Sequence, residues 1–210
     1  MDDLIAESAA FQRALDAELA AAPPLLLADA RHSAAASGTL LSIEHAGVAR
    51  EAFILGSPHS ATGLVRLQYE ALVRGAWWLF AADDGEVALL NEPLDEDADA
   101  QGRRWPGATV MQRALQGHAP AGLLAPLHQF HAVAWSGLNP YVHAGVHPMQ
   151  RRLTGFPEPL ARQMLQNSNG LLHLAYRLLT SLTGSDASLM AMSQLWLPHR
   201  ACLPNGPALG

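Results

Sequence analysis

The chain has 210 residues, of which 50% are hydrophobic and 15% are charged, so it can fold around a sizeable core and is not predominantly disordered. Its 13 basic residues are all arginines, compared with 19 acidic residues, and the formal net charge of −6 makes the chain a poor candidate for wrapping nonspecifically around nucleic acid. One cysteine, no segment resembling a secretory signal and no apolar run of membrane-spanning length predict a cytoplasmic protein without a membrane contact.

Apolar residues recur at intervals of three and four along the chain, which predicts helices and no strand. We expect helices over 2–21, 25–55 and 60–82, and the third should be central because it is apolar nearly all round. Gly38 and Gly47, inside the second helix, indicate close helix–helix contacts. Further helices are expected over 108–117, 121–138, 160–183 and 186–197, so the predicted fold class is an all-α helical bundle.

The segments between the predicted helices separate a helical core from a surface loop and a tail. Pro140 should kink or break the helix after Asn139, and we expect an irregular turn over 141–148 and a connection over 151–159. We expect one helical domain over 1–210, with its core at about 25–184. An acidic surface loop over 92–107 and a frayed tail over 204–210 lie outside that core.

A ladder of charges on the predicted central helix is the first candidate site. Arg66, Glu70 and Arg74 are spaced by four residues, so they share one ridge of the helix and Glu70 can pair with either arginine. On an exposed helix this would be an ordinary surface ladder. On a central helix it is either a buried ion-pair network or a functional site, because buried charges need full pairing.

Histidines make the second candidate site. His128 and His131 are three residues apart and His143 and His147 are four apart, spacings at which two imidazoles on one helix could share a metal ion. No HExxH motif accompanies them, and histidine pairs more often have structural roles. We therefore expect no metal and no cofactor, and keep this cluster as an alternative.

Two polar segments interrupt otherwise apolar helices. Ser136 to His143 lies at the expected helix break, where backbone groups and polar side chains are exposed together; Asn139 could equally well cap the break. Asn167, Ser168 and Asn169 lie inside a long apolar helix, which indicates hydrogen bonds to a partner across the bundle or a ligand site.

Three runs of residues together resemble a known group of proteins. RLQYEALVRGAWWLF, WSGLNPYVHAGVHP and NSNGLLHLAYRLL are similar to segments of uncharacterised bacterial all-helical proteins, which resemble the HEPN-like group. In that group an arginine–glutamate helix packs against a helix ending in a serine–histidine element. The resemblance covers about 30–184 and implies a four-helix core with additional N- and C-terminal helices.

The resemblance also implies a function in bacterial stress or antiphage defence. HEPN-like bundles are often homodimers, and some are metal-independent ribonucleases with an arginine four to six residues before a histidine. Here the places before His143 hold no arginine, so Arg66 or Arg74 would supply the charge from another helix. The implied catalytic residues are Arg66, Glu70, Asn139 and His143, and the implied binding residues are Arg74, Ser136, His147, Asn167 and Asn169.

Two classes of function follow from these observations. The first is a HEPN-like protein that cleaves or binds RNA or a partner protein, with local contacts from Arg66, Arg74, Arg151 and Arg152. The second is a metal- or small-ligand-binding bundle that uses His128, His131, His143 and His147. A homodimer is expected in addition, because aromatic surface patches often mark interfaces and the chain has five tryptophans.

Overall fold

The computed structural model describes residues 1–27, 29–91, 100 and 105–204, and these form helices and no strand, as predicted. Parts of the expected acidic loop (92–99 and 101–104) and of the expected tail (205–210) lie outside the described residues. None of the described helices is long and apolar enough to cross a membrane. The α-helices are α1 (Asp2–Ala21), α2 (Ala30–Ile54), α3 (Pro58–Phe80), α4 (Asp84–Ala88), α6 (Ala108–Ala114), α7 (Ala121–Phe130), α8 (Ser136–Val142), α9 (Val146–Thr154), α10 (Glu158–Ser181) and α11 (Asp186–Gln194).

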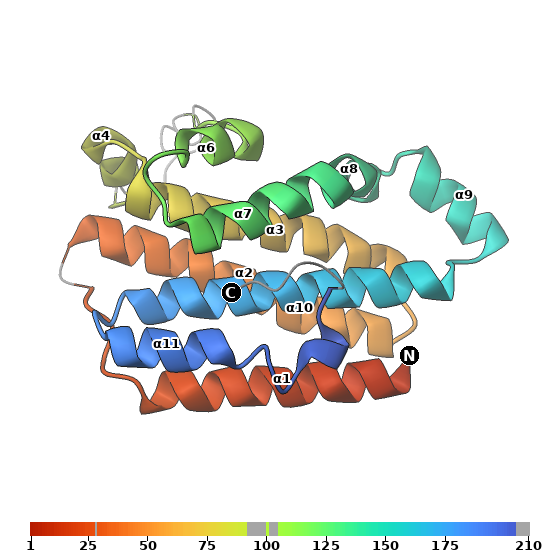
Figure 1. Ribbon diagram of the computed structural model, residues 1–210. Coiled ribbons are helices and arrows are strands. Elements are labelled where there is room, and N and C mark those ends of the chain that lie inside the picture. Colours follow the sequence, from red (N-terminus) through yellow and green to blue (C-terminus); the bar gives the residue numbers. More distant parts are fainter. Residues whose placement is uncertain (28, 92–99, 101–104, 205–210) are drawn as a thin grey trace.

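Three shorter segments complete the order of elements. A π-helical turn, η2 (His131–Trp135), joins α7 to α8, and 3₁₀ turns follow α4 (Leu89–Asn91) and α11 (Arg200–Cys202). Figure 1 shows α6, α7 and α8 in a layer above α3, with α9 projecting at one end, and α1 and α11 on the opposite side of α10. Helix α3 contacts α2, α6, α8 and α10, which confirms its central position.

Small residues let α2 and α3 pack closely. A Cβ atom at Gly38 would lie 2.9 Å from the backbone nitrogen of Gly75, and a Cβ atom at Gly75 would lie 3.0 Å from the carbonyl oxygen of Ala35. Side chains could not fit at either position without separating the helices. The helix–helix contact predicted for Gly38 is therefore confirmed, whereas a Cβ atom at Gly47 would meet nothing within 4 Å.

The predicted start of the second helix was wrong. Residues 25–27 are not helical, and the backbone N–H of Leu26 donates to the carbonyl oxygen of Leu182 at 2.8 Å. The helix begins at Ala30, after Asp29, whose carboxylate accepts a hydrogen bond from the backbone N–H of His32. An N-cap carboxylate satisfies a free N–H of the first turn and fixes the start of the helix there.

The predicted break at Asn139 was wrong, and the turn predicted over 141–148 is confined to residues 143–145. Pro140 lies inside α8, which follows directly on the π-helical turn and continues to Val142. Proline fixes φ near a helical value, so the helix can continue through it at the cost of one backbone hydrogen bond. Residues 146–154, expected to divide between a turn and a connection, form α9, which ends at Gly155 with φ 96°.

Candidate functional site

A buried arginine between α3 and the π-helical turn is the centre of the candidate site. Arg66 is only 7% exposed, and its Nη1 lies 2.5 Å from Oε1 of Glu70 on the next turn of α3. Its guanidinium stacks on the indole ring of Trp135, with Cζ 3.1 Å from the ring centroid. The predicted ladder is therefore a buried network rather than a surface feature, because Arg66 is enclosed by an aromatic ring and a carboxylate.

Aromatic rings extend this network from α3 to α7. The ring of Tyr69 stacks on Phe130 at a centroid distance of 4.8 Å and meets Trp135 edge-on at 5.2 Å. Trp135 stacks in turn on His131 at 5.2 Å, and Nε2 of His131 lies 3.2 Å from the hydroxyl of Thr109 on α6. The π-helical turn thus places two side chains, His131 and Trp135, on the same face toward α3.

Burial shapes the protonation of this network. It lowers the pKa of the Arg66 guanidinium, while the carboxylate of Glu70 acts in the opposite direction. Burial raises the pKa of Tyr69, so its hydroxyl is neutral at pH 7. Burial and the nearby charges of His128 and Arg66 lower the pKa of His131, which favours the neutral imidazole.

Several donors of the network have no partner within the described structure. They include Nε of Arg66, Nε of Arg74 and the hydroxyl of Tyr69, all of them buried. Arg74 lies one turn beyond Glu70, and its guanidinium is 5.6 Å from the ring centroid of Trp105. The network therefore holds α6, α7 and α8 onto α3 and retains spare hydrogen-bond donors there.

The other predicted site residues do not join Arg66 and Glu70. Asn139, Ser136 and His143 are exposed on or just after α8, and His147 is exposed on α9. Within the described structure, no hydrogen bond or ion pair connects any of these four to Arg66 or Glu70. They lie instead on the outer surface of the layer that the buried network supports.

The polar triplet of α10 divides over three faces of the helix. The hydroxyl of Ser168 donates to the side chain of Gln68 on α3 at 2.7 Å, and Asn169 donates to the hydroxyl of Ser8 and the carbonyl oxygen of Cys202. These two are structural residues that join three helices. Asn167 alone lines an open groove.

The four histidines proposed as an alternative metal site are separated. His128 and His131 belong to α7 and the π-helical turn, whereas His143 follows α8 and His147 lies on α9. Among the described residues, no group of three or more histidine, cysteine, aspartate or glutamate side chains could hold a metal ion. The geometry therefore gives no support to a metal-binding function.

Sequence analysis missed a second cluster at the start of α3. Nη1 of Arg151 donates to the hydroxyl of Tyr141, and its guanidinium lies 5.9 Å from the ring centroid of Phe156. His59 packs edge-on against Phe156 at 5.1 Å, and burial and the charges of Arg152 and Arg151 lower its pKa. These residues come from three segments, so no spacing in the sequence could have grouped them.

The distribution of charge along the chain was a second missed signal, and it was visible in the sequence. Of the 19 acidic residues, 17 precede residue 100, whereas 8 of the 13 arginines follow it. No acidic residue occurs between 100 and 157. The described helices of that interval, α6 to α9, therefore form a layer without carboxylates, which we call the cationic layer; its described arginines are Arg113, Arg151 and Arg152.

Comparison with known proteins identifies a family but no function. Residues 39–205 match a family of unknown function, DUF6988. No curated protein and no solved structure matches the chain.

Proposed function

The chain belongs to the family DUF6988, and we propose that it is a HEPN-like protein that binds RNA through the cationic layer of α6 to α9. The observation that carries this proposal is the absence of acidic residues from 100 to 157 in a chain whose net charge is −6. A segregated charge attracts polyanions locally, although the molecule as a whole repels them.

The side chains on this layer suit a phosphate backbone. Arg152, Arg113 and the imidazoles of His143 and His147 are exposed, and Arg151 is partly exposed beside Tyr141. Arginine binds phosphate oxygens through two parallel N–H groups, and exposed aromatic and amide groups contact bases. The Arg66 network contributes indirectly, because it holds the layer against α3 without being exposed itself.

Binding to RNA tests this proposal. We expect the protein to bind a mixed RNA population, and the double variant Arg151→Gln/Arg152→Gln to bind at least ten-fold more weakly, since each lost phosphate contact costs about 1 kcal/mol or more. Arg13→Gln, an exposed arginine on α1, is the matched control. An equal loss in the control, or no binding by the unaltered protein, would refute the proposal.

The same preparation tests the predicted ribonuclease activity. Asn139 and His143 lie on the surface of the cationic layer, where a histidine could move a proton during cleavage. Cleavage of total RNA in the presence of a chelator, abolished by His143→Ala, would support a metal-independent ribonuclease. Intact RNA with retained binding would identify a binding protein.

We also propose a homodimer, formed through the outer face of α2. Five large apolar side chains are exposed there at roughly seven-residue intervals: Leu40, Leu41, Val48, Ile54 and Leu55. Gly47 lies among them with open space above it. A glycine inside a helix costs about 1 kcal/mol relative to alanine. No contact among the described residues explains Gly47, whereas the close approach of a second α2 would.

The outer face of α2 is large enough to form the centre of a dimer interface. A 25-residue helix is about 37 Å long and about 10 Å wide, so this face covers roughly 370 Å². A stable interface buries roughly 800 Å² per partner, so residues beside α2 would supply the rest. The tryptophans do not form this surface, since Trp77 and Trp78 are buried and the other three lie outside α2 and α3.

Two valines of equal exposure provide the test. Val48 on α2 is 49% exposed and Val110 on α6 is 50% exposed. We expect the unaltered protein and Val110→Arg to be dimers by light scattering, and Val48→Arg to be a monomer. A monomeric unaltered protein, or a dimeric Val48→Arg, would show that α2 is not a dimer interface.

A further inference from the structure

A groove lies between α7 and α10 of the described structure. It has a volume of about 900 Å³ and is bounded by α7 and the π-helical turn, by α10, and by the segment from Trp196 to Pro204. That volume lies within the range of small-molecule sites in proteins. The groove shares Phe130 with the Arg66 network, but it includes neither Arg66 and Glu70 nor the described arginines of the cationic layer.

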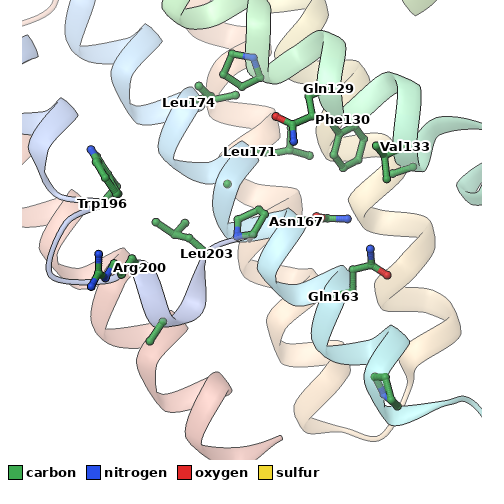
Figure 2. A pocket seen from close by; sticks show the side chains of 16 residues that line it. Gln129, Phe130, Val133, Gln163, Asn167, Leu171, Leu174, Trp196, Arg200 and Leu203 are labelled. Atoms are coloured by element: carbon green, nitrogen blue, oxygen red, sulfur yellow. The ribbon is translucent and has the colours of Figure 1, made fainter. Parts of the chain in front are cut away.

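The groove combines an apolar floor with unused polar groups. Leu171 and Leu174 of α10 form the floor, and the carboxamides of Gln129, Gln163 and Asn167 line the groove along one side (Figure 2). Within the described structure, none of these three carboxamides makes a hydrogen bond to the rest of the chain. Each therefore offers both a donor and an acceptor to a ligand.

The opposite side of the groove offers an aromatic ring and a positive charge. Trp196 is partly exposed and Arg200 is exposed, and Figure 2 shows both across α10 from Gln129. The guanidinium of Arg200 has no acidic partner among the described residues, and the groove lining contains no carboxylate. A ligand with one negative group would therefore be bound here without competition from a protein carboxylate.

We propose that this groove is a nucleotide-binding site. A nucleobase presents apolar faces to Trp196 and the leucine floor, and its edge carries the paired donors and acceptors that carboxamides recognise. Its phosphate pairs with Arg200. A fatty acid would use the floor and Arg200 but would form no hydrogen bonds with the three carboxamides, so these groups favour a ligand with a polar edge.

Binding of small ligands by calorimetry tests this site directly. The probes are the four ribonucleoside 5′-monophosphates, with uncharged nucleosides, ribose 5-phosphate and octanoate for comparison. We expect at least one monophosphate to bind at least ten-fold more tightly than ribose 5-phosphate and octanoate. If either of these binds as tightly as every monophosphate, the groove does not recognise a base and the proposal is wrong.

Matched variants separate the base and phosphate contacts. Arg200→Gln should weaken monophosphate binding about ten-fold and leave nucleoside binding unchanged, because it removes one charge-assisted hydrogen bond. Asn167→Leu should weaken the binding of both the monophosphate and the nucleoside. The controls are Arg162→Gln and Gln166→Leu, whose side chains lie on α10 outside the groove. Unchanged affinities in Arg200→Gln and Asn167→Leu would overturn the proposal.

The nucleotide could be free or could belong to an unpaired RNA strand, and competition distinguishes the two. Displacement of the bound monophosphate by a single-stranded tetraribonucleotide, but not by a duplex, indicates an RNA strand; no displacement indicates a free nucleotide. The site is independent of the proposed RNA surface. Arg151→Gln/Arg152→Gln should therefore leave monophosphate binding unchanged, so that failure of either proposal can be recognised separately.

Discussion

At the scale of single residues, Arg66 shows how this fold stabilises a buried charge. A guanidinium is more weakly hydrated than an ammonium and stacks on aromatic faces, so burial beside Trp135 is less costly than it would be for lysine. Glu70 balances the charge at 2.5 Å while its own side chain is 35% exposed. Arg66 is buried, so water cannot replace Glu70 as its partner. The stability of the folded chain therefore depends on this ion pair.

Replacing Glu70 with alanine should leave the buried charge of Arg66 without a counter-ion. We expect the free energy of unfolding to fall by about 1–3 kcal/mol, less than for a fully buried pair because Glu70 is partly exposed. Urea denaturation measures the change. Asp84→Ala, which removes the exposed partner of Arg31, is the control and should have little effect. Equal small losses in both variants would show that the Arg66 pair behaves as a surface pair.

His173 should make stability depend on pH. Its imidazole is fully buried, and its Nε2–H donates to the carbonyl oxygen of Met192 at 3.0 Å; burial lowers its pKa from about 6.5 to about 4. Between these values the unfolded chain binds a proton that the folded chain does not. Stability should therefore fall by up to about 3 kcal/mol as the pH decreases from 6.5 to 4.

The variant His173→Gln isolates this contribution from other titrating groups. An amide can still donate to Met192 but does not titrate, so the loss of stability between pH 6.5 and 4 should be smaller in the variant. Thermal unfolding at a series of pH values provides the measurement. Parallel curves for the two proteins would mean that His173 is not responsible.

At the scale of elements, the apolar repeat predicts the long helices well. It places α1, α3 and α10 within two residues of their bounds, because each of them buries one face in the core. It fails where local chemistry decides. Asp29 sets the start of α2, α8 continues through Asn139 and Pro140, and α9 buries none of its residues.

The same limit applies to the candidate site. A spacing of four residues predicts that Arg66 and Glu70 meet, because both lie on one helix. It gives no indication of Trp135, Thr109 or Tyr69, which reach the network only through packing of α6 and α7 on α3. Contacts between segments distant in sequence depend on tertiary structure, which no single-helix pattern contains.

Two glycines of α2 should respond in opposite ways to the same substitution. Gly38→Ala should lower the free energy of unfolding by about 1–3 kcal/mol, because its Cβ atom would collide with the backbone of α3. Gly47→Ala has open space and should raise the stability of the isolated monomer by about 0.5–1 kcal/mol. Denaturation at low protein concentration, where monomers dominate, measures both; destabilisation by Gly47→Ala would contradict this account.

Across the whole molecule, the acidic residues are concentrated in the first half of the chain and most arginines lie in the second. Residues 1–99 carry 17 acids and 5 arginines, whereas 100–210 carry 2 acids and 8 arginines, so formal charges of −12 and +6 combine to −6. The cationic layer lies above α3, away from α1 (Figure 1). The net charge is a sum over both halves of the chain and does not show this separation. For that reason, the net charge alone argues against nucleic-acid binding.

This division predicts how RNA binding should depend on salt. Each phosphate neutralised on a single strand contributes about −0.7 to the slope of log K against log salt concentration. Removing Arg151 and Arg152 together should therefore reduce the steepness of the slope by about 1.4, whereas Arg13→Gln on α1 should leave it unchanged. Fluorescence anisotropy with a labelled single-stranded RNA at several salt concentrations measures the slopes. If the double variant keeps the slope of the unaltered protein, the phosphates do not contact α9, and the RNA surface must lie elsewhere on the molecule.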